Sequence, residues 1–152
     1  MRTIFYYLMK NPEALRKTQT EIDSAFVNGT LSHPVQYNKA IKLPYLQAVI
    51  KEAARIYPAW QVPMPRVVPT QGLELSGIHV PGGYIVGMSP ACVQRDKGVF
   101  GQDSNVFHPE RWLESEQRTR AMDRAMLNFG AGTRTCIGKH VSHRIVSYDQ
   151  AY

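Results

Sequence analysis

The sequence predicts an α+β fold that is mainly α-helical with small β-sheets. Apolar residues recur at helical spacing in the first third of the chain, and a pattern of short alternating strands follows over 73–88. Glycine-rich and polar stretches make up much of the remainder. A hydrophobic content of 43% with 10% aromatic residues excludes a disordered tail and a collagen-like fibre. We therefore expect folded structure with long irregular segments, in one domain.

Two helices and the end of a third are expected early in the chain. Asn11-Pro12-Glu13 is typical of a helix start, because Asn11 can cap the helix, proline is tolerated at the first position and an acid suits the first turn. Asn28-Gly29 then predicts the end of this helix. Residues before Asn11 indicate the end of another helix. Pro44 begins a further helix that runs to about Tyr57, with its apolar residues in one narrow stripe.

The segment Pro58–Pro69 contains several prolines and is expected to be extended and irregular. Short strands are predicted over 73–88, with a turn at Pro81-Gly82-Gly83, and Ser89-Pro90 indicates a helix start. Residues 98–128 are expected to form a polar meander. The chain would finish with a glycine-rich loop and an amphipathic helix whose apolar residues recur every four positions: Ile137, Val141 and Ile145.

The chain has a net charge of +6 and a pI near 9.5. Because its basic residues are scattered among acidic ones, we do not expect it to bind nucleic acid. The longest apolar run, Ile4–Met9, is too short for a membrane span of about 20 residues or for a signal peptide. Two cysteines, Cys92 and Cys136, do not form a disulfide framework, so a reducing compartment is expected.

The strongest indication of function is the segment Phe129–Gly138, FGAGTRTCIG. Its first two glycines allow a tight loop with positive φ. Cys136 would lie at a helix N-terminus, where free amides and the helix dipole stabilise a thiolate. The last glycine leaves space beside the sulfur, and Arg134 could pair with an anion. A thiolate facing a planar anion is a ligand arrangement for haem iron. The alternative is a buried structural cysteine.

Two weaker features precede this loop. Glu52 and Arg55 are three residues apart on a predicted helix, and such a pair on a polar face is usually solvated and stabilises by a few tenths of a kcal/mol. Pro109-Glu110-Arg111-Trp112 places an apolar side chain beside opposite charges in a loop. Neither feature indicates a function by itself.

The three features, in this order and at these separations, resemble the C-terminal half of the cytochrome P450 family, the haem-thiolate monooxygenases. Glu52 and Arg55 match the E-x-x-R helix of the family, and Pro109–Trp112 matches its P-E-R-F segment with tryptophan in place of phenylalanine. Phe129–Gly138 matches the haem loop F-G-x-G-x-R-x-C-x-G at every specified position. The resemblance extends from about 4 to 141 and is closest to fungal microsomal members.

The resemblance implies haem b as the cofactor, with Cys136 as the axial thiolate ligand of the iron. Backbone amides after Cys136 would donate to its sulfur and adjust the redox potential. Arg66 and Arg134 would each contact a haem propionate. The residues that the resemblance places at the cofactor are Arg66, Phe129, Gly130, Gly132, Arg134, Cys136 and Gly138.

It also implies a structural ion-pair cluster that would hold the meander below the haem; its members are Glu52, Arg55 and Arg111. Residues 58–64 would line the pocket for a small organic substrate. NADPH electrons would arrive through cytochrome P450 reductase, docked on basic residues: Arg118, Arg120, Arg124, Lys139 and Arg144. Full-length relatives would reside on the cytosolic face of the endoplasmic reticulum and serve fungal secondary metabolism or xenobiotic oxidation.

The match is incomplete at both ends, so residues 1–152 are expected to form a partial domain. Met1-Arg2-Thr3 matches only the tail of the family's oxygen-activating helix, and no catalytic residue is identified. Any membrane anchor would precede Met1. The family pattern is lost over Ser142–Tyr152 and the final sheet is missing. We expect a gene fragment that exposes apolar surface. Gln94 stands where many members have histidine, without expected consequence.

Two alternatives differ in class. The first is a non-catalytic remnant, such as a pseudogene product, that binds haem or docks on a partner without turnover. The second is a thiol-dependent redox or hydrolytic enzyme in which Cys136 acts with His140 or His143, although no acid partner is evident. A zinc site is not expected, because the cysteines and histidines do not have the spacing of four ligands.

Overall fold

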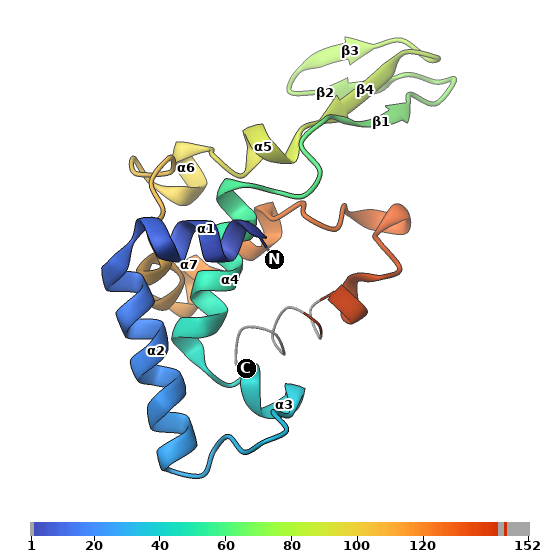
Figure 1. The fold of residues 1–152 in the computed structure, drawn as a ribbon. Helices are drawn as coiled ribbons and strands as arrows, with labels where there is room; N and C mark the ends of the chain where they lie inside the picture. Colours follow the sequence, from blue (N-terminus) through green and yellow to red (C-terminus); the bar gives the residue numbers. More distant parts are fainter. Residues whose placement is uncertain (1, 143–144, 146–152) are drawn as a thin grey trace.

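The computed structural model describes residues 2–142 and 145. It is mainly helical with two small antiparallel sheets, which confirms the predicted α+β class (Figure 1). The helices of the first part of the chain are α1 (Arg2–Lys10), α2 (Pro12–Val27), α3 (Tyr37–Ala40) and α4 (Pro44–Ile56). The predicted boundaries of α2 and α4 are therefore confirmed to within a residue or two.

The junction between α1 and α2 differs from the prediction in one respect. Asn11 does not cap α2 with its side chain; instead, its Nδ2 donates to Tyr7 O at 2.7 Å. The amide therefore satisfies a carbonyl at the end of α1, which would otherwise lack a partner. Gly29, with φ of 75°, follows the end of α2 as expected.

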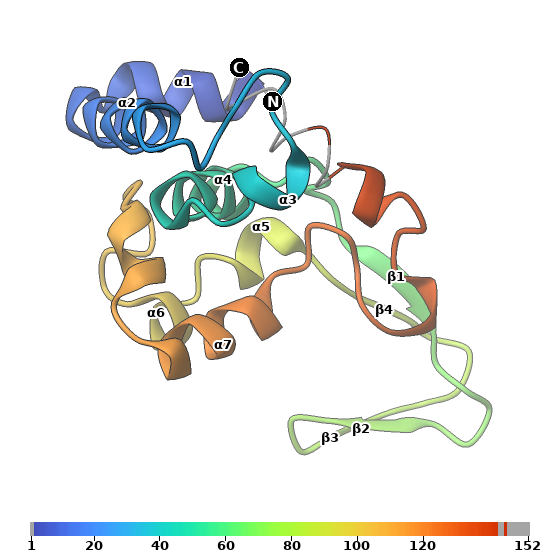
Figure 2. The ribbon, with the colours of Figure 1, turned by 90° about the horizontal axis from the view of Figure 1, so that it is seen from below.

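Helix α4 lies between the α1–α2 pair and the segment from α5 to α7 (Figure 2). Val49 packs with Ile4 in one apolar cluster, and Leu46 belongs to a second cluster with residues that follow α2. Ala48 packs with Trp112 in a third cluster on another side of the helix. The predicted single apolar stripe is therefore too narrow, because α4 is buried on several sides.

The strands form two hairpin-like pairs. β1 (Met64–Val67) pairs antiparallel with β4 (Ile85–Met88), and β2 (Leu73–Leu75) pairs with β3 (Ile78–Val80). The turn at 81–83 therefore joins β3 to β4, which are not hydrogen-bonded neighbours. The β2–β3 pair extends away from the helices in both views (Figures 1 and 2).

Apolar side chains of these strands remain exposed. Alternation predicted half-buried strands, but large apolar residues on and beside them have exposed fractions from 39% to 69%: Leu73, Leu75, Ile78, Tyr84 and Ile85. Residues 139–142 and 145 are helical, and Ile137, Val141 and Ile145 are also exposed. The rest of the predicted C-terminal helix lies outside the described residues. The predicted exposure of apolar surface is confirmed within the described part of the chain.

The predicted polar meander contains more regular structure than expected. Its elements, with the helix before it, are α5 (Pro90–Val93), α6 (Lys97–Phe100), the 3₁₀-helix η1 (Pro109–Leu113) and α7 (Glu116–Ala125). Ser115 Oγ accepts from Arg118 N at 3.2 Å and caps α7, while fully buried Met122 packs with Phe100 and Trp112. Helix α7 was not predicted within the meander, although Ser115 before an acidic first turn is a helix-start signal.

Candidate functional site

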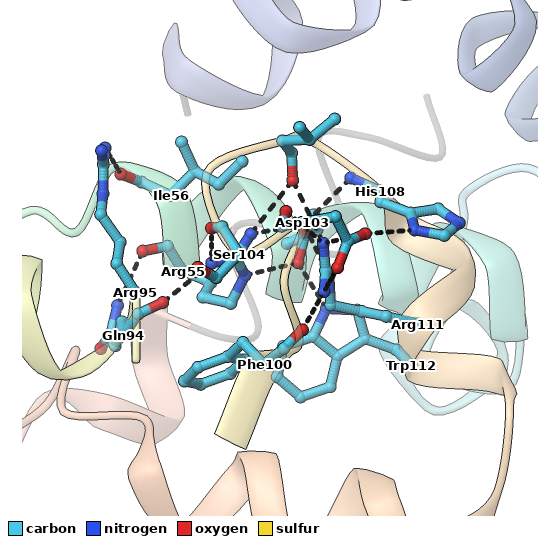
Figure 3. Close-up of polar contacts among 12 residues, drawn as sticks. Arg55, Ile56, Gln94, Arg95, Phe100, Asp103, Ser104, His108, Arg111 and Trp112 are labelled. Carbon is cyan, nitrogen blue, oxygen red and sulfur yellow. Dashed lines mark hydrogen bonds and ion pairs between the residues drawn. The ribbon is translucent and has the colours of Figure 1, made fainter. Parts of the chain in front are cut away.

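Side chains from α4 and η1 meet in a buried polar cluster, part of which is drawn in Figure 3. Glu52, Arg55 and Arg111 each have an exposed fraction of 0%. Arg55 Nε and Nη2 donate to the two carboxylate oxygens of Glu52, both at 2.8 Å, and Arg111 Nε donates to Glu52 Oε1 at 3.0 Å. Glu52 and Arg55 are therefore not the solvated pair that such spacing usually indicates, and all three members of the cluster implied by the resemblance are in contact.

The two guanidinium groups also bind the loop that precedes η1 (Figure 3). Arg55 and Arg111 donate to backbone carbonyl oxygens of this loop. Apart from the Arg111–Phe100 bond, the donor–acceptor distances are 2.6 to 3.3 Å. The acceptors are the carbonyls of Gln94, Phe100, Asp103, Ser104 and Val106. A guanidinium has five N–H donors, and buried carbonyls without donors are costly. The two arginines thus give an irregular loop the bonds that regular structure would supply.

Trp112 contributes a further bond to the cluster. Its Nε1 donates to Glu52 Oε2 at 2.9 Å, and the backbone N of His108 donates to Glu52 Oε1 at 3.0 Å. A phenylalanine at this position could not make the first of these bonds. Tryptophan in the P-E-R-W segment therefore adds a donor to the buried carboxylate, which sequence reasoning did not foresee.

Asp103 is a second carboxylate of the cluster that sequence reasoning missed. Arg111 donates to its two carboxylate oxygens at 3.0 and 2.9 Å, and His108 Nδ1 lies 2.9 Å from Oδ2. The hydrogen bond with His108, followed by those with Arg111, lowers the pKa of Asp103 to about 2. With Glu52 and Arg55, the cluster contains two carboxylates and two guanidinium groups, so its formal charges balance.

The glycine-rich loop presents Cys136 as a free, exposed thiol. Cys136 N donates to Phe129 O at 2.8 Å and Gly130 N donates to Leu127 O at 2.9 Å, which closes the loop. Gly130 and Gly132 both have φ of 69°, a left-handed conformation that a residue with a Cβ adopts only with strain. The backbone itself therefore requires these two glycines.

Gly138 leaves space beside the sulfur. A Cβ added at Gly138 would lie 3.7 Å from Cys136 Sγ, in van der Waals contact with it. No N–H of the described residues donates to Sγ, so the expected amide–sulfur bonds are absent here; Lys139 N bonds to Cys136 O instead, at 3.2 Å. The thiol is therefore open to a ligand that approaches over Gly138.

Arg134 lies in this loop, and Arg66 lies on the strand β1 on which the loop packs. Arg66 on β1 is exposed and its Nη1 donates to Pro65 O at 2.8 Å; within residues 2–142, neither Arg66 nor Arg134 of η2 (Gly132–Arg134) forms an ion pair. A Cβ at Gly130 would lie 3.6 Å from Met64 Sδ, so the loop packs on β1. Met64 and Arg66 share one face of the strand. The loop thus combines the free Cys136 thiol with Arg134 and packs on the strand that bears Arg66, an arrangement that would suit a planar metal complex with carboxylates.

Other chemistry finds less support in the described residues. No histidine among them is hydrogen-bonded to Cys136, and His143 lies outside them. They contain no group of three or more histidine, cysteine or acidic residues placed to hold a metal ion. None of their helices combines the length and apolar character needed to cross a membrane.

Comparison with known proteins agrees with this geometry. The family model described as Cytochrome P450 matches residues 1–147 of the chain. The chain belongs to the cytochrome P450 family. In general, members of this family bind haem through a cysteine, receive electrons from a reductase and take small organic substrates. The resemblance identified from the three sequence features is therefore confirmed.

Fungal cytochrome P450 monooxygenases are among the similar proteins. The monooxygenase ACRTS1 of Alternaria alternata is 57% identical over 142 residues, which cover 93% of this chain and 38% of that protein. A monooxygenase of Aspergillus terreus is 46% identical over 94% of this chain and 29% of its own length. The monooxygenase gsfF of Penicillium aethiopicum is 48% identical over 93% of this chain and 28% of its own length. The chain thus spans 28% to 38% of these relatives.

Proposed function

We propose that this chain is the haem-thiolate part of a fungal monooxygenase, with Cys136 as the axial ligand of haem b iron. The observation that supports this most directly is the free, exposed Cys136 thiol beside Gly138, in a loop that needs its two other glycines for positive φ. The backbone N–H of Cys136 donates to the carbonyl oxygen of Phe129, and this hydrogen bond closes the loop. Family membership over residues 1–147 agrees with this role.

When bound, haem would supply the activation of O2: with two electrons from NADPH and two protons, one oxygen atom would enter an organic substrate and the other would leave as water. Cys136 holds the iron as a thiolate. Arg66 and Arg134 would pair with the propionates; neither guanidinium group forms an ion pair among the described residues, and a guanidinium suits a carboxylate. The cluster of Glu52 and its two arginines would have a structural role, since it is fully buried and binds loop carbonyls.

Residues 58–64 are proposed to line the substrate pocket. Trp60 and Val62 in this segment are each 55% exposed, so their apolar surfaces are available to a small organic molecule. Ser89 Oγ donates to Gln61 O at 2.6 Å and holds the segment near β4. The substrates would belong to fungal secondary metabolism, in line with the similar fungal proteins.

The proposed electron donor is NADPH-cytochrome P450 reductase. The proposed membrane attachment is an N-terminal anchor in the endoplasmic reticulum membrane. The basic residues expected to attract the reductase differ in availability. Arg118 and Arg120 pair with acidic residues one turn away on the same segment, whereas Arg124 and Lys139 form no ion pair among the described residues. Arg144 lies outside the described residues. Arg124 and Lys139 are thus the better candidates for an acidic partner.

The test is a difference spectrum of the reduced protein with and without carbon monoxide, after reconstitution with haemin. The wild-type chain should give the strongly red-shifted Soret band of a thiolate-ligated haem. Cys136→Ser should abolish this band. Cys92→Ser is the matched control, because Cys92 is also free and exposed and should leave the band unchanged.

Each outcome discriminates between functions. A red-shifted band that depends on Cys136, together with NADPH-dependent turnover in the presence of the reductase, supports the monooxygenase. The same band without turnover supports the non-catalytic haem-binding alternative. A wild-type chain that gives no such band, or a band that survives Cys136→Ser, overturns Cys136 as the iron ligand.

A further inference from the structure

Gln94 lies at the centre of the hydrogen bonds that join α4 to the cysteine loop. It is fully buried and labelled in Figure 3 beside Arg55 and Arg95. Its backbone carbonyl accepts from Arg55 Nη1 at 2.8 Å, so its main chain belongs to the buried ion-pair cluster. Its side chain makes a separate set of bonds, which connects two segments far apart in the sequence.

One part of this set ends helix α4. The last carbonyls of a helix have no partner within the helix. Gln94 Nε2 donates to Ala54 O at 3.2 Å and to Arg55 O at 3.0 Å, while Arg95 Nη2 donates to Ile56 O at 2.9 Å. Pro58 prevents α4 from continuing, and the side chains of Gln94 and Arg95 supply hydrogen bonds to its last carbonyl groups.

The other part holds the start of the cysteine loop. Gln94 Oε1 accepts from the backbone N of Leu127 at 2.7 Å, and Nε2 also lies 3.2 Å from Asn128 Oδ1. Leu127 O in turn accepts from Gly130 N at 2.9 Å. The segment 127–130 is thus held at one end by the Gln94 amide and is closed on itself at the other.

Cys136 is connected to the same segment. Its backbone N donates to Phe129 O at 2.8 Å, one residue after Asn128. A displacement of 127–129 therefore moves the residue whose carbonyl holds the Cys136 amide. We propose that Gln94 is a positioning residue for the Cys136 thiolate: it sets where the cysteine loop lies relative to α4. This inference rests on the proposed function, in which Cys136 ligates the iron.

The chemistry of the site explains why an amide suits it. Four groups face the Gln94 side chain: one N–H donor, from Leu127, and three acceptor oxygens. An amide offers an acceptor oxygen and two N–H donors, one of which is shared between two acceptors. A carboxylate has only acceptors and would face three oxygens without a proton. Histidine keeps one donor and one acceptor, so it can replace part of the set.

The test compares Gln94→Glu and Gln94→His with Gln102→Glu, an exposed position where the same substitution is made. Amide hydrogen exchange is measured on the protein without haem, in the loop 127–136 and in the middle of α4. Gln94→Glu should speed exchange of the Leu127 and Cys136 amides by at least about tenfold, the factor that corresponds to 1.4 kcal/mol. Gln94→His should give a smaller increase, and Gln102→Glu none.

A second readout uses haemin. At a haemin concentration that saturates the wild-type chain, Gln94→Glu should give a weaker red-shifted band and Gln94→His a partial recovery. Unchanged exchange in the loop, or equal acceleration in the loop and in the middle of α4, overturns the proposal. If the wild-type chain shows no thiolate band, the proposed function fails, but the exchange measurement still decides whether Gln94 positions Cys136.

Discussion

Replacement of Glu52 by glutamine removes one charge from the buried cluster and almost no volume. Glu52 accepts five hydrogen bonds, of which three reach Oε1 and two reach Oε2. In its better orientation, the glutamine amide nitrogen takes the Oε2 position and faces the N–H groups of Arg55 and Trp112. At least two bonds are then lost, and the two guanidinium groups retain only Asp103 as a counter-charge.

We expect Glu52→Gln to lower the free energy of unfolding by about 3–5 kcal/mol, the usual cost of removing one partner from a buried ion pair. This is a large share of the total stability of a domain, about 5–15 kcal/mol. Urea unfolding followed by circular dichroism measures the loss. With an m-value of about 1.5 kcal/mol/M, a cost of 3 kcal/mol lowers the midpoint by about 2 M.

The matched control is Glu116→Gln, because Glu116 pairs with Arg120 at an exposed position one turn along α7. Its effect should stay within about 0.5 kcal/mol. If Glu52→Gln leaves no cooperative transition, Trp112→Phe supplies a milder perturbation that removes one bond to Glu52 and should cost about 1 kcal/mol. Equal midpoints for Glu52→Gln and Glu116→Gln would refute the assignment of stability to this cluster.

Other predictions concern acid stability and the cysteine loop. Because the folded-state pKa of Asp103 is lowered to about 2, its contribution to stability is complete above its ordinary pKa and is lost as pH falls towards 2. In Asp103→Asn, the melting temperature should therefore fall less steeply between about pH 4 and 2 than in the wild-type chain. An equal dependence of melting temperature on pH would contradict this. Gly130→Ala should cost about 1 kcal/mol in urea unfolding, because φ is positive. Gly138→Ala should leave stability nearly unchanged but weaken haemin binding, since its Cβ would touch Cys136 Sγ; equal haemin affinity would argue against approach over Gly138.

Much of the local structure of this protein could be predicted from the sequence. The ends of α2 and α4 depend on proline, asparagine and glycine, whose backbone preferences act within a few residues. The cysteine loop was recognised for the same reason, since Gly130 and Gly132 occupy positive φ that their own lack of a side chain permits. Such features depend on residues adjacent in the sequence, so they can be predicted without knowledge of the tertiary structure.

The buried polar cluster could not be derived in this way from the residues alone. Local spacing predicted a solvated Glu52–Arg55 pair, but Arg111 lies 59 residues beyond Glu52 and Gln94 lies 39 beyond Arg55. Burial of charge is tolerated only when all partners arrive together, and those partners come from α4, η1 and the loop between α5 and η1. The bonds that Asp103 and Gln94 make are visible only in the folded structure. The sequence by itself therefore determined helices α2 and α4, the cysteine loop and the family, whereas the tertiary structure decided which charged and amide side chains support that loop.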